Sequence, residues 1–180
     1  MCSTALRGFS PWGKLSSVAT QRQKLSTYAI TILTHQRLRL FQRTETADLM
    51  IATLLRYRDQ GRFALHAFVV MPDHLHVLIT PAVDQSTARC IQFIKGGFSF
   101  AVRELFPGQI WHSGYHEHRI RNDADFEAQK SYIANNPVRK NYANYPHVHT
   151  CYLDRLNPTQ GLKPRFCRSA RMPRLKPWLT

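Results

Sequence analysis

Residues 62–80 read RFALHAFVVMPDHLHVLIT, which is two apolar runs joined by Met-Pro-Asp at 71–73. Proline and aspartate favour turns, so this stretch predicts a β-hairpin. Alternate residues of a strand point to the same face of a sheet, which places the imidazoles of His74 and His76 together on one face. The apolar residues that alternate with them point to the other face, toward a core. The hairpin therefore predicts part of a sheet with a histidine pair on one face.

Further strands and helices are predicted on both sides of this hairpin. They comprise a strand at 27–34, a helix at 44–59 capped by Thr44 or Thr46 and ended by Gly61, a helix at 86–105, a strand at 109–121 that Gly114 could break, and a helix from Asp123 to about Asn135, capped by Asn122 and ended by Pro137. This order predicts an α+β fold, in which an antiparallel sheet carries its helices on one face. The other face is left free for a site.

The positive charge of the chain is concentrated at its two ends. The formal net charge is +14. Residues 1–44 contain seven basic and no acidic residues, and so do residues 155–180. Residues 45–154 contain 11 basic and 11 acidic residues, so the middle of the chain is neutral. At 180 residues the chain fits one domain with a substantial core.

Two positive ends on a neutral core suit a polyanionic partner, because Lys and Arg that neutralise phosphates release condensed counterions. A nucleic acid is the preferred partner. Solvated tails that only aid solubility are one alternative, and a membrane surface is another. The sequence has no run of 18 apolar residues, and neither end has a helical apolar stripe, so we expect no membrane partner.

The cysteines indicate a reducing compartment. Cys2, Cys90, Cys151 and Cys167 are scattered and form no C-x-x-C pair, so neither a disulfide framework nor a zinc ribbon is predicted. The N-terminal residues lack the apolar segment of a secretory signal. We therefore expect a cytoplasmic protein.

Two features of the sequence can carry chemistry. Histidines two residues apart on a strand are good metal ligands, although His74 and His76 could equally line a polar sheet face. Tyr132 lies one helical turn before the amide of Asn136, so both can share one helix face near a metal. The alternative for Tyr132 is a core aromatic. A phenol with a pKa near ~10 is a poor nucleophile at neutral pH, and a metal at a phosphate would lower the barrier to its attack.

The run FVVMPDHLHVLI at 68–79, followed by YIANNPV at 132–138, resembles the HUH-type single-tyrosine transposases, and most closely their REP-associated branch. YAITILT, KGGFSFAV and WHSGYHEHRIRNDADFEAQKSYIANNPVRK extend the resemblance over about residues 26–140. It implies a ferredoxin-like fold and single-stranded or hairpin DNA as substrate. It also implies a divalent metal, Mg²⁺ or Mn²⁺, on His74 and His76, with Asn136 as a further ligand. Tyr132 would be the nucleophile that forms a 5′-phosphotyrosine link.

We predict three parts. The composition predicts a flexible basic arm at 1–25 and a basic C-terminal tail at 146–180, and the resemblance implies a catalytic domain at 26–145. The DNA backbone is expected to contact four basic residues, which are Lys95, Lys130, Arg139 and Lys140. Other histidines near in sequence could line the site, but structural or surface roles are preferred for them: His66, His112, His116 and His118. After Pro137 this chain departs from the small, Gly-containing segment usual in the family, which leaves the end of the domain undefined.

Two rival interpretations have different sequence requirements. A nucleotide hydrolase or transferase with an H-x-H-x-H strand would need a third histidine, where this chain has Leu78. A non-catalytic DNA-binding protein of the same fold is the stronger rival, and formation of a covalent protein–DNA adduct would distinguish it. A monomer and a homodimer both remain open.

Overall fold

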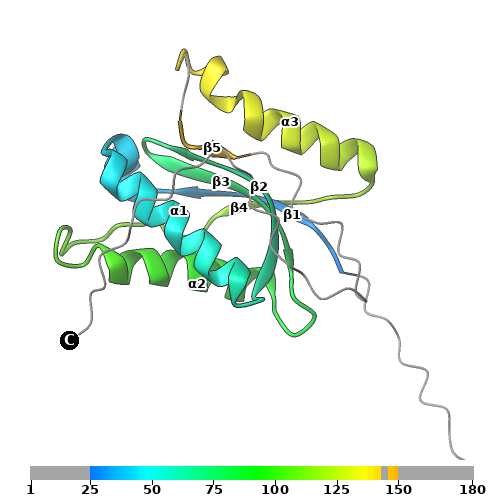
Figure 1. The fold of residues 1–180 in the computed structure, drawn as a ribbon, viewed down its shortest axis with the longest axis horizontal. Coiled ribbons are helices and arrows are strands. Elements are labelled where there is room, and N and C mark those ends of the chain that lie inside the picture. The colour runs from blue at the N-terminus through cyan, green and yellow to red at the C-terminus, as the bar shows by residue number, and fades with distance from the viewer. Residues whose placement is uncertain (1–24, 143–145, 150–180) are drawn as a thin grey trace, which may run out of the picture.

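Within the described residues, 25–142 and 146–149 of the computed structural model, five strands form one antiparallel sheet in the order β4-β1-β3-β2-β5 (Figure 1). The strands are β1 (Tyr28–Leu33), β2 (Phe63–Met71), β3 (His74–Pro81), β4 (His116–Arg119) and β5 (Val148–His149). The helices are α1 (Thr44–Asp59), α2 (Thr87–Ala101) and α3 (Asp123–Arg139), and two short 3-10 turns, η1 (His35–Arg37) and η2 (Leu40–Gln42), precede α1. The first four strands and first two helices follow the β-α-β-β-α-β order of a ferredoxin-like fold. The predicted α+β fold class is confirmed.

The helices divide between the two faces of the sheet (Figure 1). The larger core packs α1 and α2 against one face, through residues that include Ile30, Ile32, Met50, Leu54, Leu75, Val77, Ile79, Ile94 and Phe98. A smaller core lies on the opposite face and comprises Ala67, Val69, Met71, Leu78 and Ile133 of α3. The prediction that all helices lie on one face is therefore wrong for α3. The helix α3 lies on the opposite face because β2 and β3 carry apolar side chains on both faces, so both faces need a cover.

The helix α1 has the predicted bounds, although no threonine caps it. It begins after Arg43, which makes no side-chain capping bond, and the Thr46 hydroxyl donates to two backbone carbonyl oxygens instead. Gly61 ends the helix as predicted. Its φ of +68° is a left-handed conformation that favours glycine, and it lets the amide of Arg62 donate to the carbonyl of Tyr57 at 3.0 Å.

Two predicted elements are shorter than the sequence indicated. The helix α2 ends at Ala101, four residues before the predicted end. Within the predicted strand at 109–121, only β4 forms a continuous ladder, which is with β1. Trp111 forms an isolated bridge with Thr34. Gly114, with φ +77°, separates the two parts, as expected of a break at this residue.

The helix α3 is longer than predicted. Asn122 caps it as expected, because its side-chain oxygen accepts a backbone amide hydrogen bond of 2.9 Å. The predicted end at Asn135 is wrong, since the helix continues through Pro137 for a further turn. Proline removes its own amide donor and its ring crowds the carbonyl four residues earlier, which usually kinks or breaks a helix, yet α3 retains its last turn. The amides of Lys140 and Tyr142 close the last turn by donating to the Pro137 carbonyl at 3.0 and 2.9 Å.

The edge of the sheet beside β2 includes residues from the predicted tail. In β5, Val148 pairs with Val69 and His149 pairs with Phe68. Residues 150–180 of the predicted tail and residues 1–24 of the predicted arm lie outside the described residues. No helix in the described part of the chain has both the length and the apolar character needed to cross a membrane.

Candidate active site

The histidine pair lies in the middle of the sheet, on the face that α3 covers. In the register of β3, His76 is flanked by Thr31 of β1 and Val69 of β2. Both imidazoles are buried, with 6% of His74 and 8% of His76 exposed. The ring centroids lie 4.9 Å apart and the ring planes are nearly perpendicular. The alternation predicted for this strand has therefore brought the two rings together.

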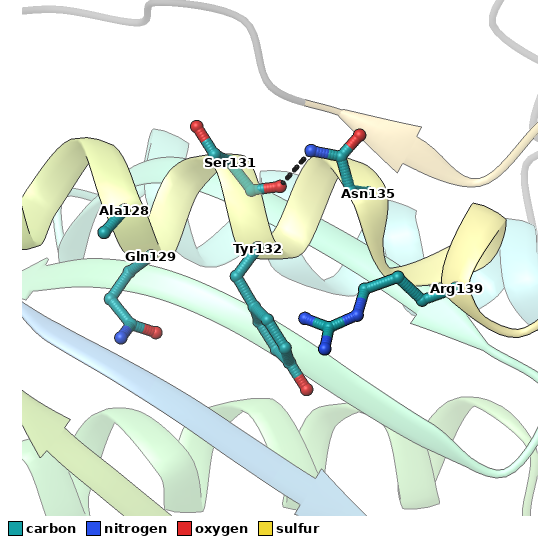
Figure 2. Close-up of a pocket in the computed structure, with 6 residues that line it drawn as sticks. All are labelled: Ala128, Gln129, Ser131, Tyr132, Asn135 and Arg139. Atoms are coloured by element: carbon teal, nitrogen blue, oxygen red, sulfur yellow. Dashed lines mark hydrogen bonds between the residues drawn. The ribbon is translucent and has the colours of Figure 1, made fainter.

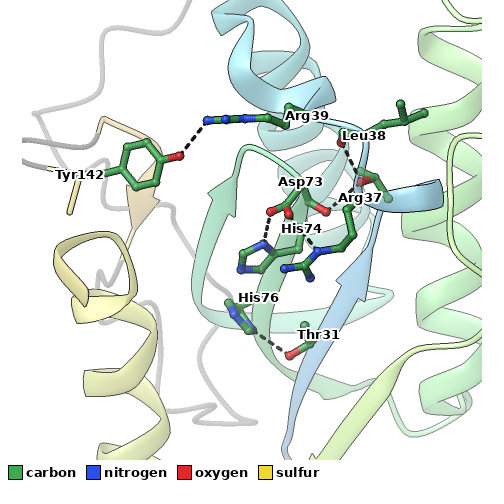
Figure 3. A network of polar contacts seen from close by, with 9 residues as sticks. Thr31, Arg37, Leu38, Arg39, Asp73, His74, His76 and Tyr142 are labelled. Atoms are coloured by element: carbon green, nitrogen blue, oxygen red, sulfur yellow. Dashed lines mark hydrogen bonds and ion pairs between the residues drawn. The ribbon is translucent and has the colours of Figure 1, made fainter. Parts of the chain in front are cut away.

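Each imidazole is held at one nitrogen (Figure 3). His74 Nδ1 lies 2.6 Å from Asp73 Oδ1, and the guanidinium of Arg37 pairs with the other oxygen of this carboxylate at 3.0 Å. His76 Nδ1 shares a hydrogen bond of 2.8 Å with the Thr31 hydroxyl. When Nδ1 donates its proton to such a partner, Nε2 carries the free lone pair that a metal would need. Both rings have such a partner at Nδ1, which leaves Nε2 of each ring available to a metal.

Burial keeps both imidazoles neutral at physiological pH. The pKa of His76 is lowered to about 4, chiefly by burial and to a smaller extent by the neighbouring charges of His74 and Lys140. Burial also lowers the pKa of His74, and this effect outweighs the hydrogen bond and charge of Asp73, which raise it. A metal ligand must present a free lone pair, so the site favours the protonation state that could bind a metal.

Tyr132 projects from α3 toward the sheet (Figure 2). Its ring centroid lies 5.5 Å from that of His76, with the rings nearly perpendicular. It remains 41% exposed, so a large substrate can reach it. The Arg139 guanidinium lies 5.4 Å from the centre of the Tyr132 ring. These contacts do not fit the core aromatic considered as the alternative for Tyr132.

Asn136 is the buried amide of the site. Only 3% of it is exposed, and its side-chain oxygen has no hydrogen-bond partner in the part of the chain that the structure describes. Leaving a buried carbonyl oxygen unpaired costs about 1–3 kcal/mol. Such an atom is therefore expected to have a ligand in the functional state. Amide oxygens are suitable ligands for hard divalent cations such as Mg²⁺ and Mn²⁺.

The donor set fits a metal that completes its coordination with substrate or water. Among the residues that the structure describes, no group of three or more His, Cys, Asp or Glu could hold a metal ion. The proposed set of two imidazoles and one amide is not such a group. Catalytic metals keep open positions, so a small protein donor set agrees with a role at a phosphate.

The four basic residues expected to contact DNA lie in different surroundings. Arg139 and Lys140 follow Asn136 at the end of α3, next to the site. Lys130 pairs with Glu127 on the same helix at 3.4 Å. Lys95 lies on α2, on the other side of the sheet, and donates to the backbone carbonyls of residues 112 and 114 at 3.0 and 2.6 Å. The structure thus brings only the first pair to the histidines.

Several site residues were not predicted from the sequence. Thr31 and Arg37 were not singled out, and Asp73 was interpreted only as a turn residue, but all three orient the histidines. Strand alternation could have indicated Thr31. A groove between α3 and strands β1, β3 and β4 is lined by residues that include Thr31, His76, His116, His118, Gln129 and Tyr132. In it His118 bonds to the Asp125 carboxylate at 2.9 Å, which lowers the pKa of Asp125.

The match to a known family covers most of this fold and site. The family described as IS200-like transposases matches residues 22–136, more than half of the chain. The chain belongs to the IS200-like transposase family. The resemblance predicted from the hairpin and the Tyr132 helix is confirmed. All of β1 to β4, both histidines, Tyr132 and Asn136 lie within the matched range.

Two individual relatives of this transposase agree with the family match. The chain is 31% identical over 87 residues to the REP-associated tyrosine transposase of Escherichia coli. The aligned region covers 48% of this chain and 51% of that protein. It therefore spans about half the length of this curated relative. A solved structure of a REP-associated tyrosine transposase bound to a REP hairpin superimposes with a TM-score of 0.60 at 25% identity, over 68% of this chain and 75% of that one.

Proposed function

We propose that this protein cleaves and rejoins single-stranded or hairpin DNA through a covalent link between Tyr132 and a 5′ phosphate. The observation that supports it most is the position of Tyr132. Its phenol stands exposed next to two buried, neutral histidines and on the same helix as the unpaired oxygen of Asn136. The hairpin bound in the solved relative supports the choice of DNA.

In the cleavage step, the Tyr132 oxygen attacks the scissile phosphorus and the bond from phosphorus to the 3′ oxygen breaks. The phenol proton leaves to solvent, and the departing 3′ oxygen takes up a proton. The product is a 5′-phosphotyrosine and a free 3′ hydroxyl. Rejoining is the reverse attack by a 3′ hydroxyl, so the exchange conserves the energy of the phosphodiester and needs no nucleotide cofactor.

A divalent ion, Mg²⁺ or Mn²⁺, would be held by His74, His76 and Asn136, and when bound it would offset negative charge on the phosphate oxygens. Asp73 and Thr31 hold the two imidazoles in the orientation that this requires. Arg139 and Lys140 would contact the phosphates on either side, because they extend the same helix beyond Asn136.

The proposal is tested by trapping the covalent adduct. The full chain is incubated with labelled single-stranded and hairpin DNA and Mn²⁺, and adducts are separated under denaturing conditions. We expect an adduct with the wild type and none with Tyr132→Phe, which keeps the ring but removes the attacking oxygen. Tyr142→Phe is the matched control, because Tyr142 is bonded to Arg39 at 3.0 Å and should retain the adduct.

An adduct that persists in Tyr132→Phe would show that another residue is the nucleophile. DNA binding without an adduct in any protein would instead indicate the non-catalytic DNA-binding alternative. Cleavage that is unaffected by excess chelator would rule out the metal.

A further inference from the structure

We propose a second binding site for the phosphate backbone of DNA, formed by Arg56, Arg62 and Arg89 on the helical side of the sheet. This arginine cluster joins the end of α1, the turn into β2 and the first turn of α2. The helices α1 and α2 lie on the face opposite α3, so the cluster is separate from the Tyr132 site (Figure 1). The choice of DNA as its ligand rests on the proposed function.

Two stacked aromatic rings hold the guanidinium groups together. Tyr57 and Phe93 lie with ring centroids 5.3 Å apart and planes 24° from parallel. The guanidinium of Arg56 lies 4.8 Å from the Tyr57 ring, and those of Arg62 and Arg89 lie 5.1 and 4.9 Å from the Phe93 ring. Stacking on aromatic faces orients a guanidinium without using its hydrogen-bond donors.

No carboxylate neutralises the cluster. Within the described residues, none of its three arginines forms an ion pair, whereas Arg58 and Arg103 on the same side of the sheet pair with Asp59 and Glu104. Asp84, which precedes α2, acts electrostatically on Cys90, and its carboxylate accepts a hydrogen bond from the Gln85 amide rather than from an arginine of the cluster. The first turn of α2 adds no acidic residue. The positive end of this helix therefore reinforces the three charges.

The donors of the cluster are largely unused. Among residues 25–142 and 146–149, the buried Arg62 Nε has no hydrogen-bond partner. Within the same ranges, the guanidinium of Arg56 donates only to Tyr57, at 3.4 Å, and that of Arg89 only to Gln92, at 2.7 Å. Three adjacent cations with free donors favour a ligand that carries several negative oxygens, and phosphate groups match the planar guanidinium fork. A nucleic-acid backbone supplies such groups in a row.

Gly97 makes this arrangement sterically possible. A Cβ at this position would lie 2.6 Å from the Tyr57 ring and 2.8 Å from the Arg56 guanidinium. A Cβ at the adjacent Gly96 would meet no atom within 4 Å, so no such constraint applies there. Of the two adjacent glycines in α2, Gly97 is therefore the one that admits the aromatic pair.

The test compares two double variants of the full chain with the same change in charge. Arg62→Gln/Arg89→Gln removes two unpaired arginines of the cluster, and Arg58→Gln/Arg103→Gln removes two paired ones. Affinity for a long labelled single strand is measured against salt concentration. For the cluster variant, we expect the slope of log K against log salt to fall in magnitude by about 1.4, which is 0.7 for each lost phosphate contact. We expect little change for the control.

Equal slopes in the two double variants would overturn the site. Displacement of the DNA by polyglutamate as effectively as by an unlabelled strand would assign the cluster to acidic proteins instead. The single variant Arg89→Gln controls for a folding defect in the double variant, because Arg89 is exposed and its guanidinium bonds to Gln92 of the same helix. It should show about half of the slope change of the double variant. Adduct formation on a short strand tests the proposed function separately and should be unchanged in the cluster variant.

Discussion

The orientation of His74 depends on a strained turn between β1 and α1. Gln36 and Arg37 have φ values of 49° and 59°, a left-handed conformation that costs non-glycine residues roughly 1–2 kcal/mol each. The turn aims the Arg37 guanidinium at Asp73, which in turn bonds to His74. Strain maintained next to a buried polar network is typical of a functional site. The turn is therefore part of the support for the proposed metal ligands.

The unpaired oxygen of Asn136 predicts a specific metal dependence. Asn136→Ala should raise the Mn²⁺ concentration needed for half-maximal adduct formation, by about tenfold or more, with activity restored at saturating metal. Asn135→Ala is the matched control, since the Asn135 amide points away from the sheet and bonds to Ser131 (Figure 2). The assay is a Mn²⁺ titration of adduct formation. Identical titrations for the two variants would remove Asn136 from the ligand set.

Burial of His76 predicts a pH-dependent stability in the metal-free protein. Its pKa falls from 6.5 to about 4 on folding, so between these values the unfolded chain binds a proton that the folded chain does not. The free energy of unfolding should therefore rise with pH across this window and level off above it, by at most roughly 3 kcal/mol. His74, whose pKa is also lowered, adds in the same direction.

Urea unfolding in chelator from pH 4 to pH 7 measures this slope. His76→Gln should flatten it, whereas His112→Gln, at an exposed position, should leave it unchanged. A wild-type protein equally stable across the range would contradict the prediction.

The residues of the site differ in how far the sequence could predict them. His74, His76, Tyr132 and Asn136 belong to two short motifs, and the structure brings them to one face. Arg37 could not be found in this way, because its role depends on an irregular turn that neither a two-residue nor a 3.6-residue period describes. The Asn136–Pro137 step was expected to leave the helix, yet tertiary packing of α3 overrides that local bias.

At the scale of elements, the sequence predicted which segments are helices and strands better than it predicted which face each helix covers. Alternation in β3 separates His76 from Val77. It does not show that Leu78 and Val69 build a second core for α3. The helix α3 enters that core through the buried Ile133, and the partly buried Phe126 packs against it. Two such apolar residues are too weak a pattern to assign a helix to a face.

The two glycines in α2 predict opposite effects on stability. Gly96→Ala should stabilise the protein by up to about 1 kcal/mol, because alanine favours the helix and the added methyl meets nothing within 4 Å. Gly97→Ala should destabilise it by about 1–3 kcal/mol, because the methyl would overlap the Tyr57 ring. Urea unfolding of both variants provides the comparison. Stabilisation by both would mean that α1 can move away from α2 without penalty.

At the scale of the whole molecule, the residues proposed for chemistry and the net charge lie in different parts of the chain. His74, His76, Tyr132 and Asn136 lie within the neutral residues 45–154, while the net charge of +14 comes from the segments on either side. Phosphate contacts made by those segments would supply affinity without sequence information, and the site would supply the reaction. Binding and cleavage should therefore be separable by truncation.

Removal of residues 155–180 deletes seven positive charges and no negative ones. Binding to single-stranded DNA should weaken, and its salt dependence should flatten. If half of those charges contact phosphate, the slope of log K against log salt should change by roughly two units, at about 0.7 for each contact. Adduct formation at saturating DNA should persist, because Tyr132 and the proposed metal ligands remain. A thermal melt of the truncated protein separates lost contacts from lost stability. If the truncated protein melts like the full chain and keeps its salt slope, the segment contributes solubility and not DNA affinity.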